Sequence, residues 1–271
     1  MKVLLISFVF VISTSLMGQI ITIDNIDGIP ISYHIDETRQ VSVVKCEKAD
    51  FFLYSGKLVI PSYVMYNDTK YFVTSTADEA FKEYGPSSVV IPNTVKYIGS
   101  YAFWGSGLQE VRLPKRLITI GFNAFNNTKW YDKQSNGPIY INKTLYDYKA
   151  LAHEIQQSFS DEVWVYKVLP SNTQLIIPKG CVWISDHALS DCLNLISVDI
   201  PKTVRYVGQF AFARCLNMTH IIVHWKRPLR ISEDALKMID FSRCTLIVPK
   251  GCKARYQQAE GWKGFKEIIE Q

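Results

Sequence analysis

Short alternating apolar triplets recur along the chain, and most of them end in proline. Two apolar residues flank a variable middle residue in each triplet, and the pattern with its proline occupies residues 58–61, 89–92, 111–114, 175–178, 198–201 and 246–249. A seventh triplet, 221–223, is followed by His224 in place of proline. Period-two alternation predicts a strand whose outer members face inward and whose middle member faces outward. Proline ends the strand because it brings no N–H to the ladder.

A second motif follows the prolines at a fixed distance. An Ala-Phe or Ala-Leu pair begins ten residues after the proline in four repeats. Further apolar residues stand three and six residues after the same proline. Apolar residues at six, ten and eleven positions predict one face of a helical or 3₁₀ turn. Each repeat of 22 or 23 residues is therefore predicted to be a strand, a turn and a helical segment. One such winding cannot bury its apolar side alone, so neighbours are expected to stack around a common interior as a solenoid.

The repeats at 91–103 and 200–215 resemble those of BspA-like leucine-rich-repeat proteins, which occur on the surfaces of host-associated anaerobic bacteria. The resemblance extends over nearly the whole chain after its N-terminus. It implies an α+β repeat solenoid, a right-handed stack of short parallel strands with helical or 3₁₀ turns. An N-terminal β cap is expected at residues 19–57 and the solenoid at 58–271. A C-terminal helical cap is expected at about 250–271, with a helix over 253–265.

The repeat period breaks between Pro114 and Pro178. Residues from about 130 to 170 resemble an insertion known in the family, and their pattern predicts a β-hairpin carried on the solenoid. Such insertions often shape a binding surface, although a spacer packed on its own aromatic residues fits the pattern as well. Within this segment His153-Glu154 begins a zinc-protease motif, but Gln157 stands where the second histidine would be required, which favours a solvated helix face.

The N-terminus has the pattern of a secretory signal peptide. Lys2 precedes an apolar run to Ile12 that only Ser7 interrupts, and a Ser/Thr-containing stretch leads to Gly18. We predict a signal peptide over residues 1–18, against the alternative of a buried N-terminal strand. No cysteine follows the run, which disfavours a lipoprotein, and no later stretch is long enough to span a bilayer. The expected location is therefore secreted or on the bacterial cell surface.

Composition narrows the function classes. Apolar residues make up 48% of the 271 residues, too many for a disordered chain, and the net charge of +5 is spread along the sequence rather than clustered as on a nucleic-acid-binding surface. The sequence contains no Cys-x-x-Cys pair, Gly-rich phosphate loop or catalytic-triad motif. We therefore predict no enzymatic activity, no catalytic residue, no cofactor and no metal site.

The six cysteines are too few for a disulfide scaffold. Cys181 and Cys252 hold a column that is elsewhere Val or Leu, which predicts small buried residues. Cys192 and Cys215 share a column in adjacent windings, and both a disulfide and a pair of stacked thiols fit that spacing.

Two outward columns are the candidate binding surfaces. The strand face and its flank supply Arg112, Lys115, Ile176, Asp199, His220, His224 and Trp225. The second column, five residues after proline, supplies Trp183 and Tyr206. Flat aromatic side chains suit glycan or protein recognition, although stacking between windings also stabilises a solenoid without any ligand.

These features predict a secreted or cell-surface binding module. The family resemblance implies adhesion to a host extracellular-matrix or cell-surface protein, with a glycan as a further candidate partner. The alternatives are a structural or self-assembling envelope component and a glycan-binding protein. The sequence does not predict an oligomeric state.

Overall fold

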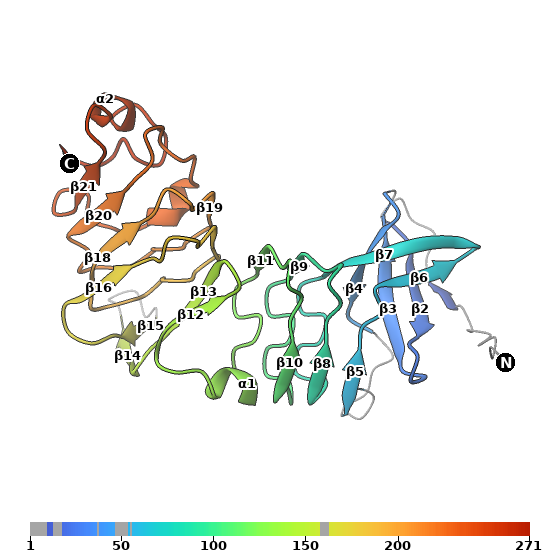
Figure 1. Ribbon diagram of the computed structural model, residues 1–271. Helices are drawn as coiled ribbons and strands as arrows, with labels where there is room; N and C mark the ends of the chain where they lie inside the picture. The colour runs from blue at the N-terminus through green and yellow to red at the C-terminus, as the bar shows by residue number, and fades with distance from the viewer. Residues whose placement is uncertain (1–9, 13–17, 37, 47–53, 55, 158–162) are drawn as a thin grey trace. The chain divides into compact units, whose positions relative to one another are not determined.

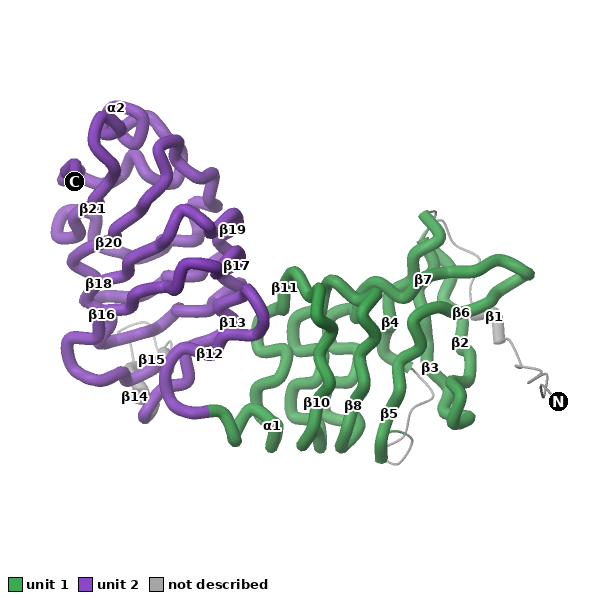
Figure 2. Tube along the Cα trace, in the orientation of Figure 1, with its two compact units in different colours: residues 1–134 green, residues 135–271 purple. Residues whose placement is uncertain are grey.

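A computed structural model describes residues 10–12, 18–36, 38–46, 54, 56–157 and 163–271 of the chain (Figure 1). The chain divides into two compact units, residues 1–134 and 135–271 (Figure 2). The division falls within the segment where the repeat period breaks. Each unit has its own parallel ladder, of three strands in the first and five in the second, so the fold is a β-solenoid of about eight turns.

The first unit begins with an antiparallel sheet. Its strands are β2 (Ile20–Asp24), β3 (Pro30–Ile35), β4 (Gln40–Val44), β6 (Tyr63–Tyr66) and β7 (Thr69–Thr76). Neighbours pair antiparallel except β4 and β7, which run parallel. Burial alternates along β2 and β4, as in a sheet with one buried face, and Ile21, Ile31, Val41 and Val73 are buried.

The described part of the predicted signal peptide includes a further strand. β1 (Phe10–Ile12) pairs antiparallel with β2, while residues 1–9 and 13–17 lie outside the described residues. The signal peptide therefore stays a prediction.

The triplets of the first unit form a parallel ladder, as predicted. Its strands are β5 (Lys57–Val59), β8 (Ser88–Val90) and β10 (Glu110–Arg112). Leu58, Val89 and Val111 are in register, which aligns the prolines that follow them. Further along each winding, the buried rings of Phe81, Phe103 and Phe125 stack, with centroid separations of 5.1 and 5.5 Å.

The helical segments predicted after each proline are absent from most windings. Isoleucines six residues after proline lie in two-residue strands, β9 (Tyr97–Ile98) and β11 (Thr119–Ile120), which extend the sheet from β7. The following Ala-Phe segment is a series of turns. The described helices are single turns of four residues: α1 (Lys129–Asp132), η1 (Glu233–Leu236) and α2 (Lys253–Tyr256). None of them is long enough to cross a membrane.

Hydrogen bonds between windings explain why these segments are not helical. The Phe103 N–H donates to the Ala124 carbonyl at 2.8 Å, and the Leu189 N–H donates to the Ala211 carbonyl at 2.8 Å. Alternate N–H groups thus point along the stack, whereas a helix would direct them back into its own turn. Tyr101 and His187 have positive φ of 56°, an uncommon conformation for such residues that permits this direction.

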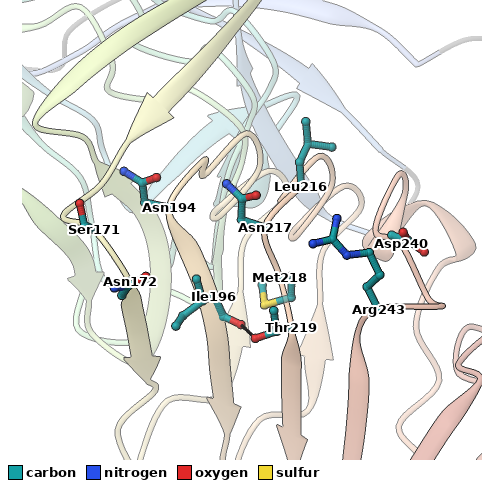
Figure 3. Close-up of a pocket in the computed structure, with 10 residues that line it drawn as sticks. All are labelled: Ser171, Asn172, Asn194, Ile196, Leu216, Asn217, Met218, Thr219, Asp240 and Arg243. Carbon is teal, nitrogen blue, oxygen red and sulfur yellow. Dashed lines mark hydrogen bonds between the residues drawn. The ribbon is translucent and has the colours of Figure 1, made fainter.

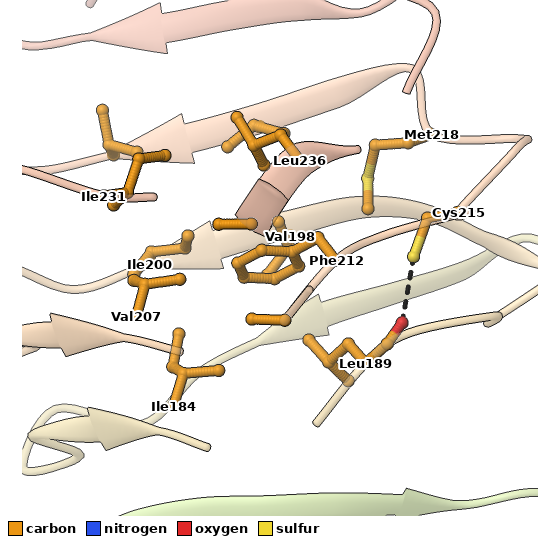
Figure 4. Close-up of a cluster of buried hydrophobic side chains, with 14 of the residues drawn as sticks. Ile184, Leu189, Val198, Ile200, Val207, Phe212, Cys215, Met218, Ile231 and Leu236 are labelled. Atoms are coloured by element: carbon orange, nitrogen blue, oxygen red, sulfur yellow. Dashed lines mark hydrogen bonds between the residues drawn. The ribbon is translucent and has the colours of Figure 1, made fainter. Parts of the chain in front are cut away.

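The second unit contains a five-stranded parallel sheet. Its strands are β16 (Thr173–Ile176), β18 (Leu195–Ile200), β20 (His220–Val223), β21 (Thr245–Val248) and β22 (Glu267–Glu270). Val198, Ile221 and Leu246 are in register and fully buried. They pack with Leu189, Phe212 and Leu236 in one continuous core (Figure 4). Burial of alternate residues in these strands confirms the predicted inward and outward positions.

The insertion consists of two β-hairpins. The first joins β12 (Gly137–Ile141) to β13 (Thr144–Lys149), and the second joins β14 (Ala152–Gln157) to β15 (Val163–Val168). The first hairpin is built into the stack rather than carried on it, because β13 pairs with β17 (Trp183–Ile184), which pairs with β19 (Tyr206–Val207). The predicted helix face beginning at His153 is wrong, since this residue lies in β14.

The predicted C-terminal helical cap is also wrong in form. Only one helical turn, α2, is present, and Gly261 has a φ of +78° that interrupts any continuation. Tyr256 and Trp262 nevertheless fill the end of the core, because both are almost fully buried. The chain then returns as β22, a fifth strand parallel to β21.

All six cysteines are buried free thiols. Cys181 and Cys252 lie in the core as predicted, and Cys192 and Cys215 are stacked thiols rather than a disulfide. The Cys215 thiol donates to the Leu189 carbonyl at 3.0 Å.

Candidate functional site

The outer face of the five-stranded sheet has two rows of side chains. Register aligns one residue from each strand in a polar row: Gln174, Ser197, His220, Thr245 and Glu267. Two positions further along the strands, an apolar row contains Ile176, Asp199, Ile222, Ile247 and Ile269. Ile176 is 75% exposed and Ile269 is 42% exposed. Isoleucine at four of five outward positions makes this row an apolar stripe, hereafter the isoleucine row.

A groove of about 840 Å³ opens beside the isoleucine row, where β16, β18 and β20 end. The strand-ending prolines create it, because they stop the ladder and turn the chain away. Its floor includes the buried residues Ile177, Pro201 and Trp225. Four exposed cationic side chains also line it: Lys179, Lys202, Lys226 and Arg227.

His224 and Asp199 form the polar link across the groove. His224 stands at the position that proline occupies in the other windings, so its side chain is free to reach the preceding strand. Its Nε2 lies 2.7 Å from Asp199 Oδ1. Asp199 is the acidic residue among those lining the groove, so this pairing leaves the four cations without an acidic partner there.

Trp225 does not lie on the outward surface where the sequence placed it. The side chain is only 8% exposed, and its Nε1 donates to the Val204 carbonyl at 2.9 Å. The Tyr256 hydroxyl donates to the Trp225 carbonyl at 2.8 Å. Burial is favoured because the ring packs near Trp262, with centroids 6.1 Å apart, while its one polar atom is satisfied. Trp225 thus shapes the groove from below.

The structure brings together four of the nine predicted site residues: Ile176, Asp199, His224 and Trp225 line the groove. His220 is exposed at the start of β20, where its Nδ1 lies 2.9 Å from the Thr219 hydroxyl. Arg112 and Lys115 are exposed in the first unit, at and just beyond the end of β10.

Trp183 and Tyr206 form a separate aromatic pair on β17 and β19. Their ring centroids are 4.2 Å apart, and the next pair along the windings, His187 and Phe210, stacks at 4.9 Å. Stacking between windings is as predicted. The pair is nevertheless accessible in part, because Tyr206 is 38% exposed.

A second hollow, of about 370 Å³, lies at the opposite ends of the same strands (Figure 3). Asn194 and Asn217 line it, and each Nδ2 donates at 2.7 Å to a carbonyl of the preceding winding, Leu169 and Leu193 respectively. These two side chains therefore link consecutive windings. Arg243 and Asp240 stand at its far side.

Burial favours the uncharged forms of several cysteines and of one histidine in the second unit. Burial raises the pKa of the Cys192 thiol to about 12 and that of Cys244 to about 12, so both stay protonated at neutral pH. Burial lowers the pKa of His187, which disfavours its charged form. No group of three or more His, Cys, Asp or Glu residues within the described residues is arranged to hold a metal ion.

Sequence reasoning missed Ile247 and Ile269, the last two members of the isoleucine row, and the cations Lys226 and Arg227. The spacing of 23 residues between Pro201 and His224 was the signal in the sequence, because it equals one repeat and so places His224 where the other windings have their proline. Continued through the last two strands, the same register aligns Ile222 with Ile247 and Ile269.

Comparison with solved structures finds distant leucine-rich-repeat proteins from several bacteria. A Bacteroides ovatus leucine-rich repeat protein is 20% identical, with 88% of this chain and 59% of that chain covered and a TM-score of 0.40. The Treponema protein described as T. pallidum leucine-rich repeat protein is 16% identical over 96% of this chain and 82% of that chain, with a TM-score of 0.34. The pneumococcal vaccine antigen PcpA is 12% identical, with 92% of this chain and 98% of that chain covered and a TM-score of 0.34. The chain thus spans about three-fifths of the length of the B. ovatus protein.

A comparison with curated proteins found no match. The family model described as BspA type leucine-rich repeat region matches in six copies, over residues 74–153 and 165–248. These ranges contain most of the windings of both units and more than half of the chain. The chain therefore belongs to the BspA-type leucine-rich-repeat family.

Proposed function

We propose that this protein is a secreted or cell-surface binding module that adheres to host proteins or cells and has no enzymatic activity. Membership of the family suggests a protein-binding or surface protein, and BspA-like repeat proteins are typically non-enzymatic. The signal-peptide pattern at residues 1–18 supports export. The partner would be an extracellular-matrix or cell-surface protein.

One observation carries the proposal: the isoleucine row continues into an apolar-floored groove. Exposed apolar side chains next to a concave apolar floor and rimmed by polar residues are typical of surfaces that bind other proteins. Here Ile176 lies at the groove, and Asp199 separates it from Ile222 in the row. Ile176 belongs to both the row and the groove lining, and its 75% exposure leaves it available to a partner.

Solid-phase binding of the purified chain to a panel of matrix proteins and to intact host cells tests the proposal. Ile176→Glu places a charge at the end of the isoleucine row that lines the groove and should reduce binding about tenfold or more. It should leave folding intact because the side chain packs against little. Arg112→Glu is the matched control, since it changes an exposed outward residue of β10 in the first unit.

Three results would contradict this proposal: no binding to any matrix protein or cell, equal losses in both variants, or retained binding in Ile176→Glu. Sedimentation velocity of the wild-type chain tests the alternative that the protein self-assembles. Discrete oligomers that dissociate in Ile176→Glu would assign the isoleucine row to contacts between copies instead.

A further inference from the structure

The groove has an unbalanced set of charges. Lys179, Lys202, Lys226 and Arg227 line it, and among the residues that the structure describes none of these four side chains has an ion-pair or hydrogen-bond partner. Asp199 is held by His224. Like charges gathered around one concavity raise the local positive potential and attract anions. The groove therefore favours an anionic ligand.

The floor of the groove restricts which anion fits. Ile177 and Pro201 present only apolar side-chain atoms, and the single polar side-chain atom of Trp225 is already bonded to Val204. Sulfated sugars carry polar groups on all sides and would lose hydrogen bonds to water on this floor without replacement. A ligand that combines negative charges with apolar side chains satisfies both features.

The spacing of the windings sets the form of the ligand. Register places Lys179, Lys202 and Trp225 one winding apart, at about 4.8 Å between neighbouring strands, so the groove crosses three windings in roughly 10 Å. An extended peptide covers that length with about three residues, and its successive side chains point to opposite sides. Acidic side chains can then face the lysines while apolar ones face the floor.

We infer that the groove binds an extended acidic peptide segment in which carboxylate and apolar side chains alternate. The inference rests on the proposed function and names the chemistry of the segment that a partner protein would present. Recognition through exposed cations also makes binding dependent on salt, because such charges are screened within about 8 Å at physiological ionic strength.

Fluorescence anisotropy of the full chain with a labelled nine-residue peptide of alternating Glu and Leu tests this inference. Lys202→Glu should weaken binding about tenfold, since it replaces an attraction by a repulsion at the centre of the groove. Lys115→Glu is the matched control: Lys115 also follows a strand-ending proline, Pro114, and is also exposed, but it lies in the first unit. That variant should bind within twofold of wild type.

Three further probes distinguish the ligand classes. The isosteric Gln-Leu peptide should bind at least tenfold more weakly than the Glu-Leu peptide, and raising salt from 50 to 300 mM should weaken only the latter. Heparin and vesicles containing phosphatidylserine supply negative charge without alternating side chains. Binding of heparin or vesicles alone would overturn the inference in favour of a glycan or a membrane.

Equal affinities for the Glu and Gln peptides, or equal losses in Lys202→Glu and Lys115→Glu, would also overturn it. If the peptide does not bind but capture of a host protein still depends on Ile176, the acidic-segment inference fails while the proposed function stands. Thermal unfolding followed by circular dichroism verifies that each variant is folded.

Discussion

The two units fill the same interior position with different side chains. Eleven residues after each proline, the first unit has the stacked rings of Phe103 and Phe125, in line with Phe81. The second unit has Leu189, Phe212 and Leu236 in the corresponding column. The rings of the first unit are nearly parallel, with interplanar angles of 15° and 5°, so each ring depends on its neighbours in the stack. The column of the second unit contains both leucine and phenylalanine, so it tolerates either side chain. The winding thus fixes which positions face inward, but not which side chains occupy them.

The exteriors differ more than the interiors. The residue after the strand-ending proline is Ser62, Asn93 or Lys115 in the first unit, and there the Asn93 side chain accepts a hydrogen bond from the Lys115 N–H at 2.9 Å. In the second unit Lys179 and Lys202 occupy this position. The same column therefore links neighbouring windings in one unit and lines a groove in the other.

Removing one ring from the phenylalanine column should have the largest effect. Phe103→Ala removes a fully buried ring stacked on both sides and should lower the free energy of unfolding by about 3–5 kcal/mol. Phe212→Leu, which places in the second unit a residue already used by its neighbours, should cost less than about 1.5 kcal/mol. Urea unfolding followed by circular dichroism measures both. A similar loss of unfolding free energy in both variants would show that the two columns are equally sensitive to a change of side chain.

Two residues that stand seven positions after a proline, Gly121 in the first unit and Ser185 in the second, should respond in opposite directions to alanine substitution. A Cβ on Gly121 would stand 2.6 Å from the Gly99 carbonyl carbon, so Gly121→Ala should cost about 1–3 kcal/mol.

Ser185 holds the same position in the second unit, and its buried hydroxyl has no hydrogen-bond partner in the described structure. Ser185→Ala should therefore stabilise the protein by up to about 1 kcal/mol. Thermal unfolding compares the two variants, and a loss of stability in Ser185→Ala would refute the asymmetry.

The smallest effect concerns pH. Burial lowers the pKa of His187 below that of a free histidine, so the unfolded chain binds a proton at a higher pH than the folded chain does. The contribution of His187 is complete above its unfolded pKa of about 6.5 and declines as the pH falls toward the folded value.

In the first unit the equivalent residue is Tyr101, which has no imidazole. Melting temperatures at pH 7.5 and 5.5 should differ less in His187→Phe than in wild type. An NMR titration that places the pKa of His187 above 6.5 would reverse the expectation.

The parallel ladders were predictable because alternation along a strand directly reports which residues are buried. Leu58, Val89 and Val198 illustrate this. Where the repeat is 22 or 23 residues long, as from Val89 to Val111 and from Val198 to Ile221, the register follows from that length. The helical segments were not predictable in their true form. Ile98, Ala102 and Phe103 do face inward, at a spacing that also fits a helix, but a two-residue strand places Ile98 there and tight turns place Ala102 and Phe103. The positive φ of Tyr101 leaves no mark in the sequence.

The candidate groove was predictable only in part. Ile176, Asp199 and His224 follow from the outward positions of single windings. The groove itself depends on the side chains of three windings at once and on the inward rotation of Trp225. That rotation is decided by the Val204 carbonyl 21 residues away, which no local pattern contains.

The hydrogen bonds that join windings through their turns have a mechanical consequence. They lie along the direction in which windings are stacked. A force that pulls in this direction therefore loads the hydrogen bonds between neighbouring windings one after another. A stretched stack would then lengthen in small equal steps rather than in a single rupture. Each released winding of 23 residues would add about 80 Å of extended chain, which would let a tethered protein absorb tension gradually.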